Sequence, residues 1–240
     1  MLKRKRFGLI GRNIDYSFSR QYFSKKFKKE NLTNCEYVNY DINHINDFKK
    51  IKISDYCGFN VTIPFKVDIL KFLDIIDKNA LKIGAVNTIK IKNNLLQGYN
   101  TDYLGFLKTI EDYNFNKAAV FGSGGASKAV CYALDLKKIP YLIYSRKSNP
   151  NFLDYSNQKK HIPNCDLIVN TTPLGTFPKT DQCPPINFNL ISKKSVCYDL
   201  IYNPRETKFL LESKSIGAKT INGLKMLENQ AEESWRIWNG

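Results

Sequence analysis

Residues 59–66, FNVTIPFK, bring together the residue types that a small polar ligand requires. Asn60 and Thr62 are two residues apart, so on a strand both side chains point to the same face. The proline that follows has no N–H group and ends the strand, and Lys66 comes at the start of a predicted helix, 65–73. An amide, a hydroxyl and an ammonium group therefore reach one edge of a sheet. The alternative is an ordinary edge strand whose polar residues face water.

A second candidate site lies at 118–129, AAVFGSGGASKA, where an apolar strand leads into a glycine turn and a helix. The turn consists of Gly122, Ser123, Gly124, Gly125 and Ala126. Its first glycine permits a tight turn, and its second lets the backbone approach a pyrophosphate, which the helix N-terminus then faces. Ser127 stands where the third glycine of the usual pattern would be. The context predicts dinucleotide binding, and the alternative is a strand–helix turn without a ligand.

The next predicted strand, 141–144, ends in Ser145, Arg146 and Lys147. An enzyme that uses NAD presents Asp or Glu at this place, where the carboxylate binds the ribose 2′-hydroxyl. A carboxylate would repel a 2′-phosphate, whereas the Arg146 guanidinium can pair with it through two hydrogen bonds. These residues predict NADP(H) as the cofactor, and the alternative is a solvated basic turn.

Strand and helix patterns alternate along the chain, which is typical of an α/β fold. In the first part we expect strands at 7–11, 35–40, 58–63, 86–92 and 95–99, in a mixed sheet. Helices are expected from Ser17 or Ser19 to 29, at 44–50 and at 65–73. A further helix is expected to end at about residue 83, and another to run from 101 or 102 to 113. The second part has strands at 118–121, 141–144, 167–170 and 196–200 in a doubly wound, Rossmann-like parallel sheet. The last segment, 223–238, is an amphipathic helix.

These elements predict two α/β domains: a substrate domain, 1–102 plus 223–240, and an NADP domain, 103–222. The 240 residues suffice for both. The net charge of +15 favours anionic ligands, but it is dispersed and accompanies no nucleic-acid-binding motif. The six cysteines form no C-x-x-C pair, so we expect no metal site and a reducing, cytoplasmic location. No apolar run approaches a signal-peptide core or a membrane span.

The chain also resembles the shikimate dehydrogenase family over nearly its whole length. The resemblance rests on eight short motifs in a fixed order: 17–19, 59–66, 84–88 (GAVNT), 100–102 (NTD), 122–126, 170–175 (NTTPLG), 198–204 (YDLIYNP) and 222–231 (NGLKMLENQA). Each motif is modest alone, and their common order is specific. The chain departs from the family's usual pattern at Tyr16 and Arg20, beside the serine pair, and at Lys225.

The resemblance implies reversible, NADPH-dependent reduction of 3-dehydroshikimate to shikimate, a step toward chorismate and the aromatic amino acids. It assigns Lys66 and Asp102 to the catalytic acid/base pair. Substrate-binding residues would be Ser17, Ser19, Thr62, Lys66, Asn87, Asp102, Tyr202 and Gln230. Cofactor-binding residues would be the glycine turn, Ser145, Arg146 and Lys147, with Leu200, Gly223 and Met226 at the nicotinamide.

The chemistry agrees with this assignment, because an alkoxide that develops at a reduced ketone needs a positioned proton donor. A Lys ammonium group can donate that proton, and Asp102 would orient it. The alternative for the pair is a structural ion pair. A quinate/shikimate dehydrogenase of broader specificity and a non-catalytic nucleotide-sensing protein are the alternative functions. We expect a monomer or homodimer that binds a small molecule, and neither nucleic acid nor membrane.

Overall fold

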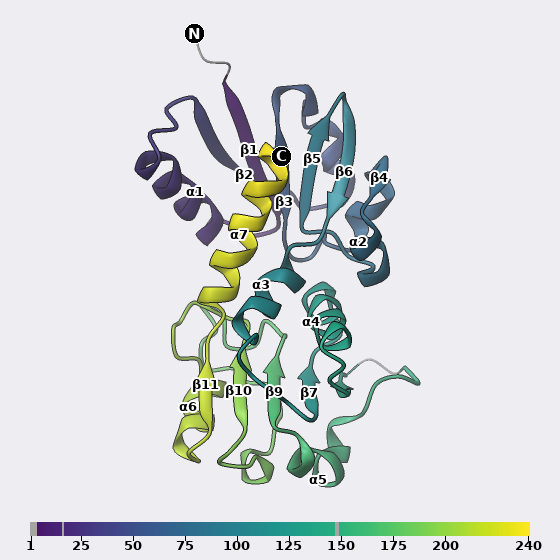
Figure 1. Cartoon of the computed structure of the whole chain (residues 1–240), viewed down its shortest axis with the longest axis vertical. Coiled ribbons are helices and arrows are strands. Elements are labelled where there is room, and N and C mark those ends of the chain that lie inside the picture. Colours follow the sequence, from purple (N-terminus) through teal and green to yellow (C-terminus); the bar gives the residue numbers. More distant parts are fainter. Residues whose placement is uncertain (1–3, 16, 147–148) are drawn as a thin grey trace. The chain divides into compact units, whose positions relative to one another are not determined.

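The computed structural model describes residues 4–15, 17–146 and 149–240, which form two compact α/β units (Figure 1). The first unit consists of the residues up to Thr101 with Gln230–Gly240, and the second is Asp102–Asn229. The last helix, α7 (Leu224–Asn239), therefore contributes to both. The expected division lay at 222/223; the first turns of α7 join the second unit, where Asn229 Nδ2 donates to the Gly105 carbonyl (3.4 Å).

The first unit contains a mixed six-stranded sheet in the order β2-β1-β3-β5-β6-β4. Its strands are β1 (Lys5–Gly11), β2 (Cys35–Asp41), β3 (Gly58–Val61), β4 (Ile75–Ile76), β5 (Thr88–Lys92) and β6 (Leu95–Tyr99). β1, β2 and β3 are parallel, and β5 runs antiparallel to β3 and to β6. Asn93 and Asn94 connect β5 to β6 with φ of 53° and 61°, the conformation that two-residue hairpins favour. The predicted mixed sheet and hairpin are confirmed.

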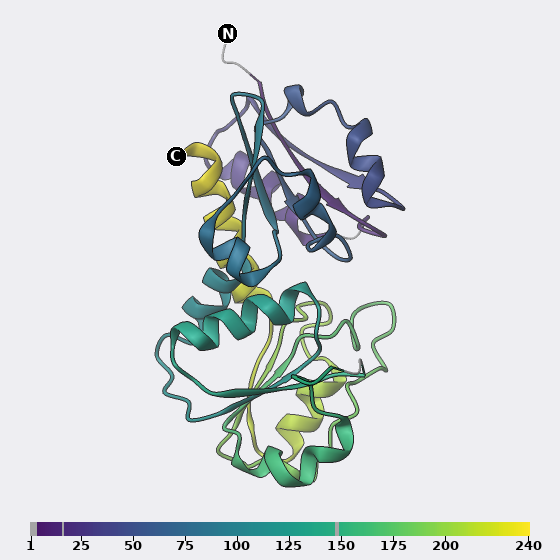
Figure 2. The same ribbon diagram turned by 90° about the vertical axis from the view of Figure 1, so that its right-hand side faces the viewer.

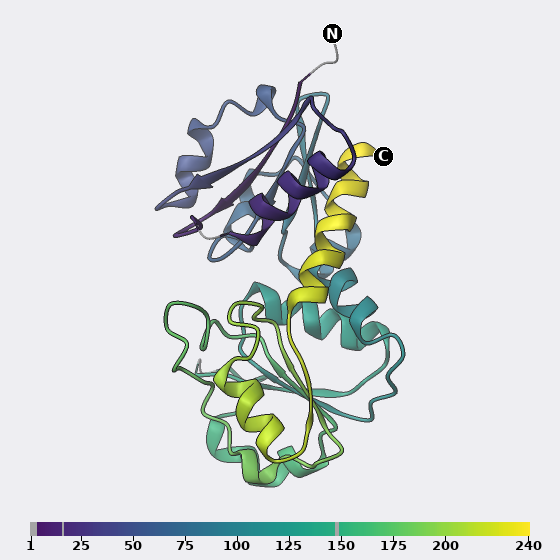
Figure 3. The same ribbon diagram turned by 90° about the vertical axis from the view of Figure 1, so that its left-hand side faces the viewer.

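Each face of this sheet has its own core. On one face lie α1 (Phe18–Lys29) and α7 (Figure 3). Phe23 of α1 and Trp238 of α7 pack there in one core with Phe7. The other face is covered by short helices (Figure 2). Phe59 and Phe48 pack against each other in the core of this face. The short helices are η1 (Ile45–Lys50), η2 (Ile53–Asp55), η3 (Asp68–Phe72) and α2 (Lys78–Ile83).

The second unit is a parallel five-stranded sheet in the order β11-β10-β9-β7-β8. Its strands are β7 (Ala118–Phe121), β8 (Tyr141–Tyr144), β9 (Leu167–Asn170), β10 (Val196–Asp199) and β11 (Lys219–Ile221). Its helices are α3 (Asp102–Thr109), α4 (Gly125–Leu136), η4 (Tyr155–Asn157), α5 (Gln158–His161), η5 (Ile162–Asn164), η6 (Phe188–Leu190) and α6 (Lys208–Ser215). Phe106 of α3 packs on Tyr198, and Phe209 of α6 packs in the core of the opposite face with Phe121. The predicted doubly wound, Rossmann-like unit is confirmed.

The expected helix at 65–73 is wrong. Only the 3-10 helix η3 (Asp68–Phe72) forms there, and Lys66 lies in the turn before it. The Lys66 carbonyl, which would accept the Leu70 N–H in an α-helix, instead accepts that of Val86 (2.7 Å). The helix expected to reach residue 113 ends at Thr109, whose hydroxyl donates to the Phe106 carbonyl (2.6 Å).

Candidate active site

Sheet topology gathers the polar segments of the first unit at one edge. β1 and β3 are parallel and end at Gly11 and Val61, so the segments that follow them leave from the same edge. Asn60 pairs with Thr88, and Thr88 with Tyr99, so β5 begins and β6 ends at this edge as well. Residues 12–15 and 17 and the segments 62–66, 86–87 and 100–101 therefore meet there, and four of the expected substrate residues lie among them.

Ser17 and Ser19 begin helix α1. Ser17 is the N-cap residue, and its hydroxyl accepts the Ser19 N–H (3.2 Å), which satisfies a donor at the helix start. Ser19 is buried, and its side chain acts on the phenol of Tyr37, where it opposes the rise that burial causes in the pKa of that phenol. The preceding loop is fixed by Asp41, whose carboxylate accepts the N–H groups of Asn13 (2.9 Å) and Ile14 (3.1 Å).

Thr62 and Lys66 follow the end of β3. Thr62 is partly buried and its N–H donates to the Ile10 carbonyl (2.9 Å), which fixes it beside β1. Lys66 is partly buried as well, and its carbonyl accepts the N–H of Val86. This bond joins the Lys66 turn to the segment that carries Asn87.

Asn87, Thr101 and Gln230 form a buried cluster of neutral polar groups. Asn87 Oδ1 accepts the Thr101 N–H (2.7 Å), and Asn87 Nδ2 donates to Gln230 Oε1 (3.2 Å). Gln230 Nε2 has no hydrogen-bond partner within the described ranges, and it is not among their buried unpaired polar atoms. Its two N–H groups are thus available to an oxygen-rich ligand.

The glycine turn of the second unit joins β7 to α4. Gly122 has φ of +116°, and a Cβ there would lie 2.5 Å from Thr171 Oγ1, so only glycine fits. A Cβ at Gly124 would meet nothing within 4 Å, so the space beside it is open. Gly124 is also the N-cap of α4 and offers no side-chain bond, which leaves the first N–H groups of a twelve-residue helix directed outward. Ser123 lies in this turn, and Gly125 and Ala126 open the helix.

The residues after β8 come next to this turn, since β7 and β8 are neighbours. The hydroxyls of Ser123 and Ser145 are hydrogen-bonded (2.8 Å), which holds the end of β8 against the glycine turn. Arg146 is exposed, and its charge opposes the rise that burial causes in the pKa of Tyr155. Lys147, the third residue expected here, lies outside the described residues, as does Tyr16.

The loop after β10 carries Leu200 and Tyr202, both partly buried. A Cβ at Gly223 would lie 1.9 Å from the Leu200 carbonyl oxygen, so glycine is required for this close approach. Met226 is buried in the first turns of α7, whereas Lys225 points to solvent and pairs with Glu228. Lys225, where the chain departs from the family's usual pattern, therefore does not disturb the close contact between Gly223 and the Leu200 carbonyl.

Asp199 at the end of β10 anchors this loop. It is buried, and its carboxylate accepts from Ile201 N (3.0 Å), Asn170 Nδ2 (3.1 Å) and Thr207 Oγ1 (2.6 Å). Burial raises the pKa of Asp199 to about 6, although all three hydrogen bonds oppose the rise. A group that is partly neutral near pH 6 thus holds the segment that positions Leu200.

Comparisons with known proteins identify the family. A family model described as the shikimate dehydrogenase substrate binding domain matches residues 9–89. A curated relative from Methanococcus aeolicus, named shikimate dehydrogenase (NADP(+)), is 40% identical over 263 residues, covering 99% of this chain and 93% of the relative. The chain belongs to the shikimate dehydrogenase family.

Two solved members of this family share the fold. The shikimate dehydrogenase from Aquifex aeolicus is 34% identical with a TM-score of 0.88, covering 100% of this chain and 95% of that one. The Thermus thermophilus enzyme, solved in complex with NADP(H) and shikimate, is 27% identical with a TM-score of 0.87, covering 98% and 94%. The family resemblance and the two-domain α/β fold predicted from the sequence are confirmed.

The two units divide the expected site residues of this family member. The first carries Ser17, Ser19, Thr62, Lys66, Asn87 and Gln230, and the second carries Asp102, Tyr202 and the cofactor residues. Asp102 is buried and begins α3 directly after Thr101. Among the described residues no group of three or more His, Cys, Asp or Glu could hold a metal ion, and no helix of that part of the chain is long and apolar enough to cross a membrane.

Sequence reasoning missed several residues that hold the site together. Asp41 and Tyr37 lie on β2, which the sequence analysis treated as a plain strand. Ser234 gave one usable signal, because it lies four residues after Gln230 and so shares its helix face. Asp199 lies within the 198–204 motif, but the residues of that motif do not indicate that its carboxylate is buried.

Proposed function

We propose that this chain catalyses the reversible reduction of 3-dehydroshikimate to shikimate with NADPH, with Lys66 and Asp102 as its acid/base pair. The observation that supports this best is the near-complete match to relatives named NADP-dependent shikimate dehydrogenase. The polar edge of the first sheet and the glycine turn of the second unit supply the two kinds of binding group that the reaction needs.

The residues of the second unit fit a dinucleotide phosphate. The uncapped start of α4 presents N–H groups to a pyrophosphate, and the open space beside Gly124 admits it. Arg146 would pair with the 2′-phosphate, and Ser145 holds the strand end from which Arg146 leaves. When bound, NADPH supplies the hydride for the reduction. Leu200, Gly223 and Met226 would border the nicotinamide.

The residues of the first unit fit a small molecule rich in hydroxyl groups. Ser17, Ser19 and Thr62 offer hydroxyls at the ends of β1 and β3. Gln230 offers two N–H donors, fixed by the bond that its Oε1 accepts from Asn87. With Tyr202 of the second unit, these groups would hold the hydroxyls and the carboxylate of shikimate.

Lys66 and Asp102 would move the proton. Negative charge develops on the ketone oxygen during reduction, and an ammonium group beside it donates a proton. In the oxidation direction a neutral Lys66 accepts the proton from the substrate hydroxyl. Asp102 is buried, so its carboxylate would orient Lys66 and the substrate hydroxyl in a setting where charge interactions are strong. A cytoplasmic location and a monomeric or homodimeric state stay predictions from the sequence.

Replacement of Lys66 tests the proposed function. Lys66→Ala removes the proton donor, so we expect kcat to fall by roughly 10²–10⁴-fold, the usual contribution of general acid–base catalysis, while NADPH binding is retained. The measurement follows the nicotinamide absorbance with shikimate or quinate and NADP or NAD. Lys71→Ala, an exposed lysine on η3, is the matched control and should turn over like the wild type.

Each outcome of this assay has a distinct meaning. Unchanged turnover in Lys66→Ala would remove the role given to Lys66. A wild-type chain that prefers quinate, or NAD, would belong to the broader quinate/shikimate type. A wild-type chain that binds NADP and turns over none of the four pairs would contradict the enzyme function itself.

A further inference from the structure

A buried network of uncharged polar groups lies beneath the expected substrate residues of the first unit. Its centre is Asn60, which is only 4% exposed. Asn60 Oδ1 accepts from the Tyr37 phenol (2.8 Å), and Asn60 Nδ2 donates to Ser234 Oγ (2.9 Å) and to the Asn87 carbonyl (3.2 Å). A reversed amide would place Oδ1 against the Asn87 carbonyl oxygen, so only one orientation is satisfied.

One arm of the network leads from Asn60 to Ser19. The Tyr37 phenol has a single proton and donates it to Asn60, so toward Ser19 it can act only as an acceptor, and the Ser19 side chain lowers its pKa accordingly. Burial raises the pKa of Tyr37 well above its usual value, which keeps the phenol a donor at any working pH. The Tyr37 phenol therefore offers the Ser19 hydroxyl an acceptor that favours one orientation of this hydroxyl.

The other arm leads from Asn60 to Gln230. Ser234 Oγ lies 2.8 Å from Thr88 Oγ1 and 3.2 Å from Thr101 Oγ1, and all three hydroxyls are fully buried. Thr101 holds Asn87 through its N–H, and Asn87 holds Gln230 Oε1. Ser234 also donates to the Gln230 carbonyl (3.0 Å), one turn earlier on α7.

We propose that Tyr37, Asn60 and Ser234 are positioning residues that hold Ser19, Asn87 and Gln230 in the geometry that binds the substrate. The inference rests on the proposed function. The links from Asn60 to Tyr37, Ser234 and Asn87, and from Asn87 to Gln230, are hydrogen bonds between buried groups of one unit, so the removal of one hydroxyl leaves a partner unsatisfied and able to turn. Such supporting partners affect binding by fixing the groups that touch the ligand, without touching it themselves.

Tyr37→Phe tests the network with a matched control on the same strand. The ring stays stacked on Phe23 (centroids 4.7 Å apart), and only the phenol oxygen is lost. We expect the KM for shikimate to rise on the order of tenfold, while kcat and the KM for NADP are unchanged. Tyr40→Phe removes a phenol of β2 that bonds Tyr56 in the core of the other sheet face, so it should leave all three constants unchanged.

Ser234→Ala tests the other arm, since alanine preserves the helix and removes only the hydroxyl. It should raise the KM for shikimate in the same way, and in the double variant with Tyr37→Phe the rise should fall short of the product of the two single rises. If the wild type is active and the KM for shikimate of Tyr37→Phe and of Ser234→Ala equals that of Tyr40→Phe, the inference is overturned while the proposed function stands. A wild type without shikimate turnover would overturn the proposed function and the inference together.

Discussion

At the scale of single residues, the choice between the two nicotinamide cofactors depends on one exposed cation. Arg146 follows β8, directly after the buried Ser145 whose hydroxyl joins the glycine turn. A guanidinium group at this place can bind a phosphate through two hydrogen bonds, whereas a ribose hydroxyl offers it far less. The sequence alone predicts this preference, because both the residue type and its place after the second strand are local features.

Arg146→Ala should raise the KM for NADPH by roughly ten- to a hundredfold, the range of a lost hydrogen bond to a charged group, and hardly change the KM for NADH. The measurement is steady-state turnover of each cofactor at saturating substrate. Arg236→Ala, an exposed arginine that pairs with Glu233 at the end of α7, controls for the loss of surface charge. Equal rises for NADPH and NADH in Arg146→Ala would show that the guanidinium does not read the 2′-phosphate.

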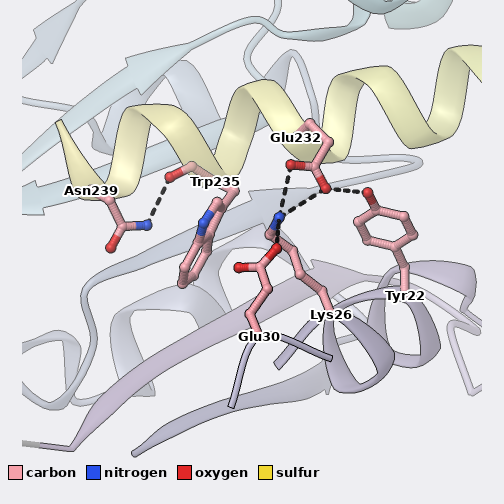
Figure 4. A network of polar contacts seen from close by, with 6 residues as sticks. All are labelled: Tyr22, Lys26, Glu30, Glu232, Trp235 and Asn239. Carbon is pink, nitrogen blue, oxygen red and sulfur yellow. Dashed lines mark hydrogen bonds and ion pairs between the residues drawn. The ribbon is translucent and has the colours of Figure 1, made fainter. Parts of the chain in front are cut away.

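At the scale of elements, α1 and α7 are joined by an ion pair above their shared aromatic core (Figure 4). Lys26 Nζ binds Glu30 Oε1 (2.7 Å) and Glu232 Oε2 (2.8 Å), and it lies 5.7 Å from the centre of the Trp235 ring. The Lys26 side chain is 11% exposed, while both carboxylates are roughly half exposed. Tyr22 donates to Glu232 as well. This contact fixes the helix that begins with the serine pair against the helix that carries Gln230.

Lys26→Met should lower the free energy of unfolding by about 1–2 kcal/mol, between the values for exposed and buried ion pairs. The change keeps the apolar stem and leaves two carboxylates together without a cation. Lys25→Met replaces the exposed neighbour on the same helix and should change stability by less than about 0.5 kcal/mol. Urea denaturation of both variants measures the difference, and equal midpoints would mean that the ion pair contributes nothing.

The sequence predicted well those elements whose structure depends only on residues close together in the chain. The Asn93-Asn94 hairpin and the N-cap at Ser17 depend on residues within one turn, and both are found. The helix expected at 65–73 failed because a distant N–H, that of Val86, takes the Lys66 carbonyl. β4 and β11 were not predicted, since strands of two and three residues carry too few side chains to show a pattern.

At the scale of the whole molecule, topology places the expected site residues and long-range contacts orient them. Parallel strands deliver their carboxyl ends to one edge of each sheet, so the motifs that follow them could be assigned to a site from the sequence. The network around Asn60 could not, because its partners Tyr37 and Ser234 are 23 and 174 residues away along the chain. Only the folded sheet and α7 bring them together.

The pH dependence of stability should show the buried carboxyl of Asp199. Its pKa is raised from 3.8 to about 6 in the folded chain, so the folded state binds more protons than the unfolded state in this interval. Its stabilising contribution is fully present below pH 3.8 and is lost as the pH rises through about 6. Exposed Asp154 acts in the opposite sense, because hydrogen bonds from Ser156 lower its pKa and its contribution is lost as the pH falls.

Asp199→Asn isolates this effect, since an amide keeps the shape and the acceptor for Ile201 N but cannot ionise. Relative to the wild type, the variant should gain up to about 3 kcal/mol of unfolding free energy between pH 4 and 7, which is the linkage equivalent of the raised pKa. Urea denaturation at several pH values measures the difference, whereas Asp154→Asn should give a nearly constant difference over this interval and change with pH only below about pH 4. A pH-independent difference for Asp199→Asn would show that the carboxyl titrates alike in the folded and unfolded chain, so that the loop after β10 is held without a proton at Asp199.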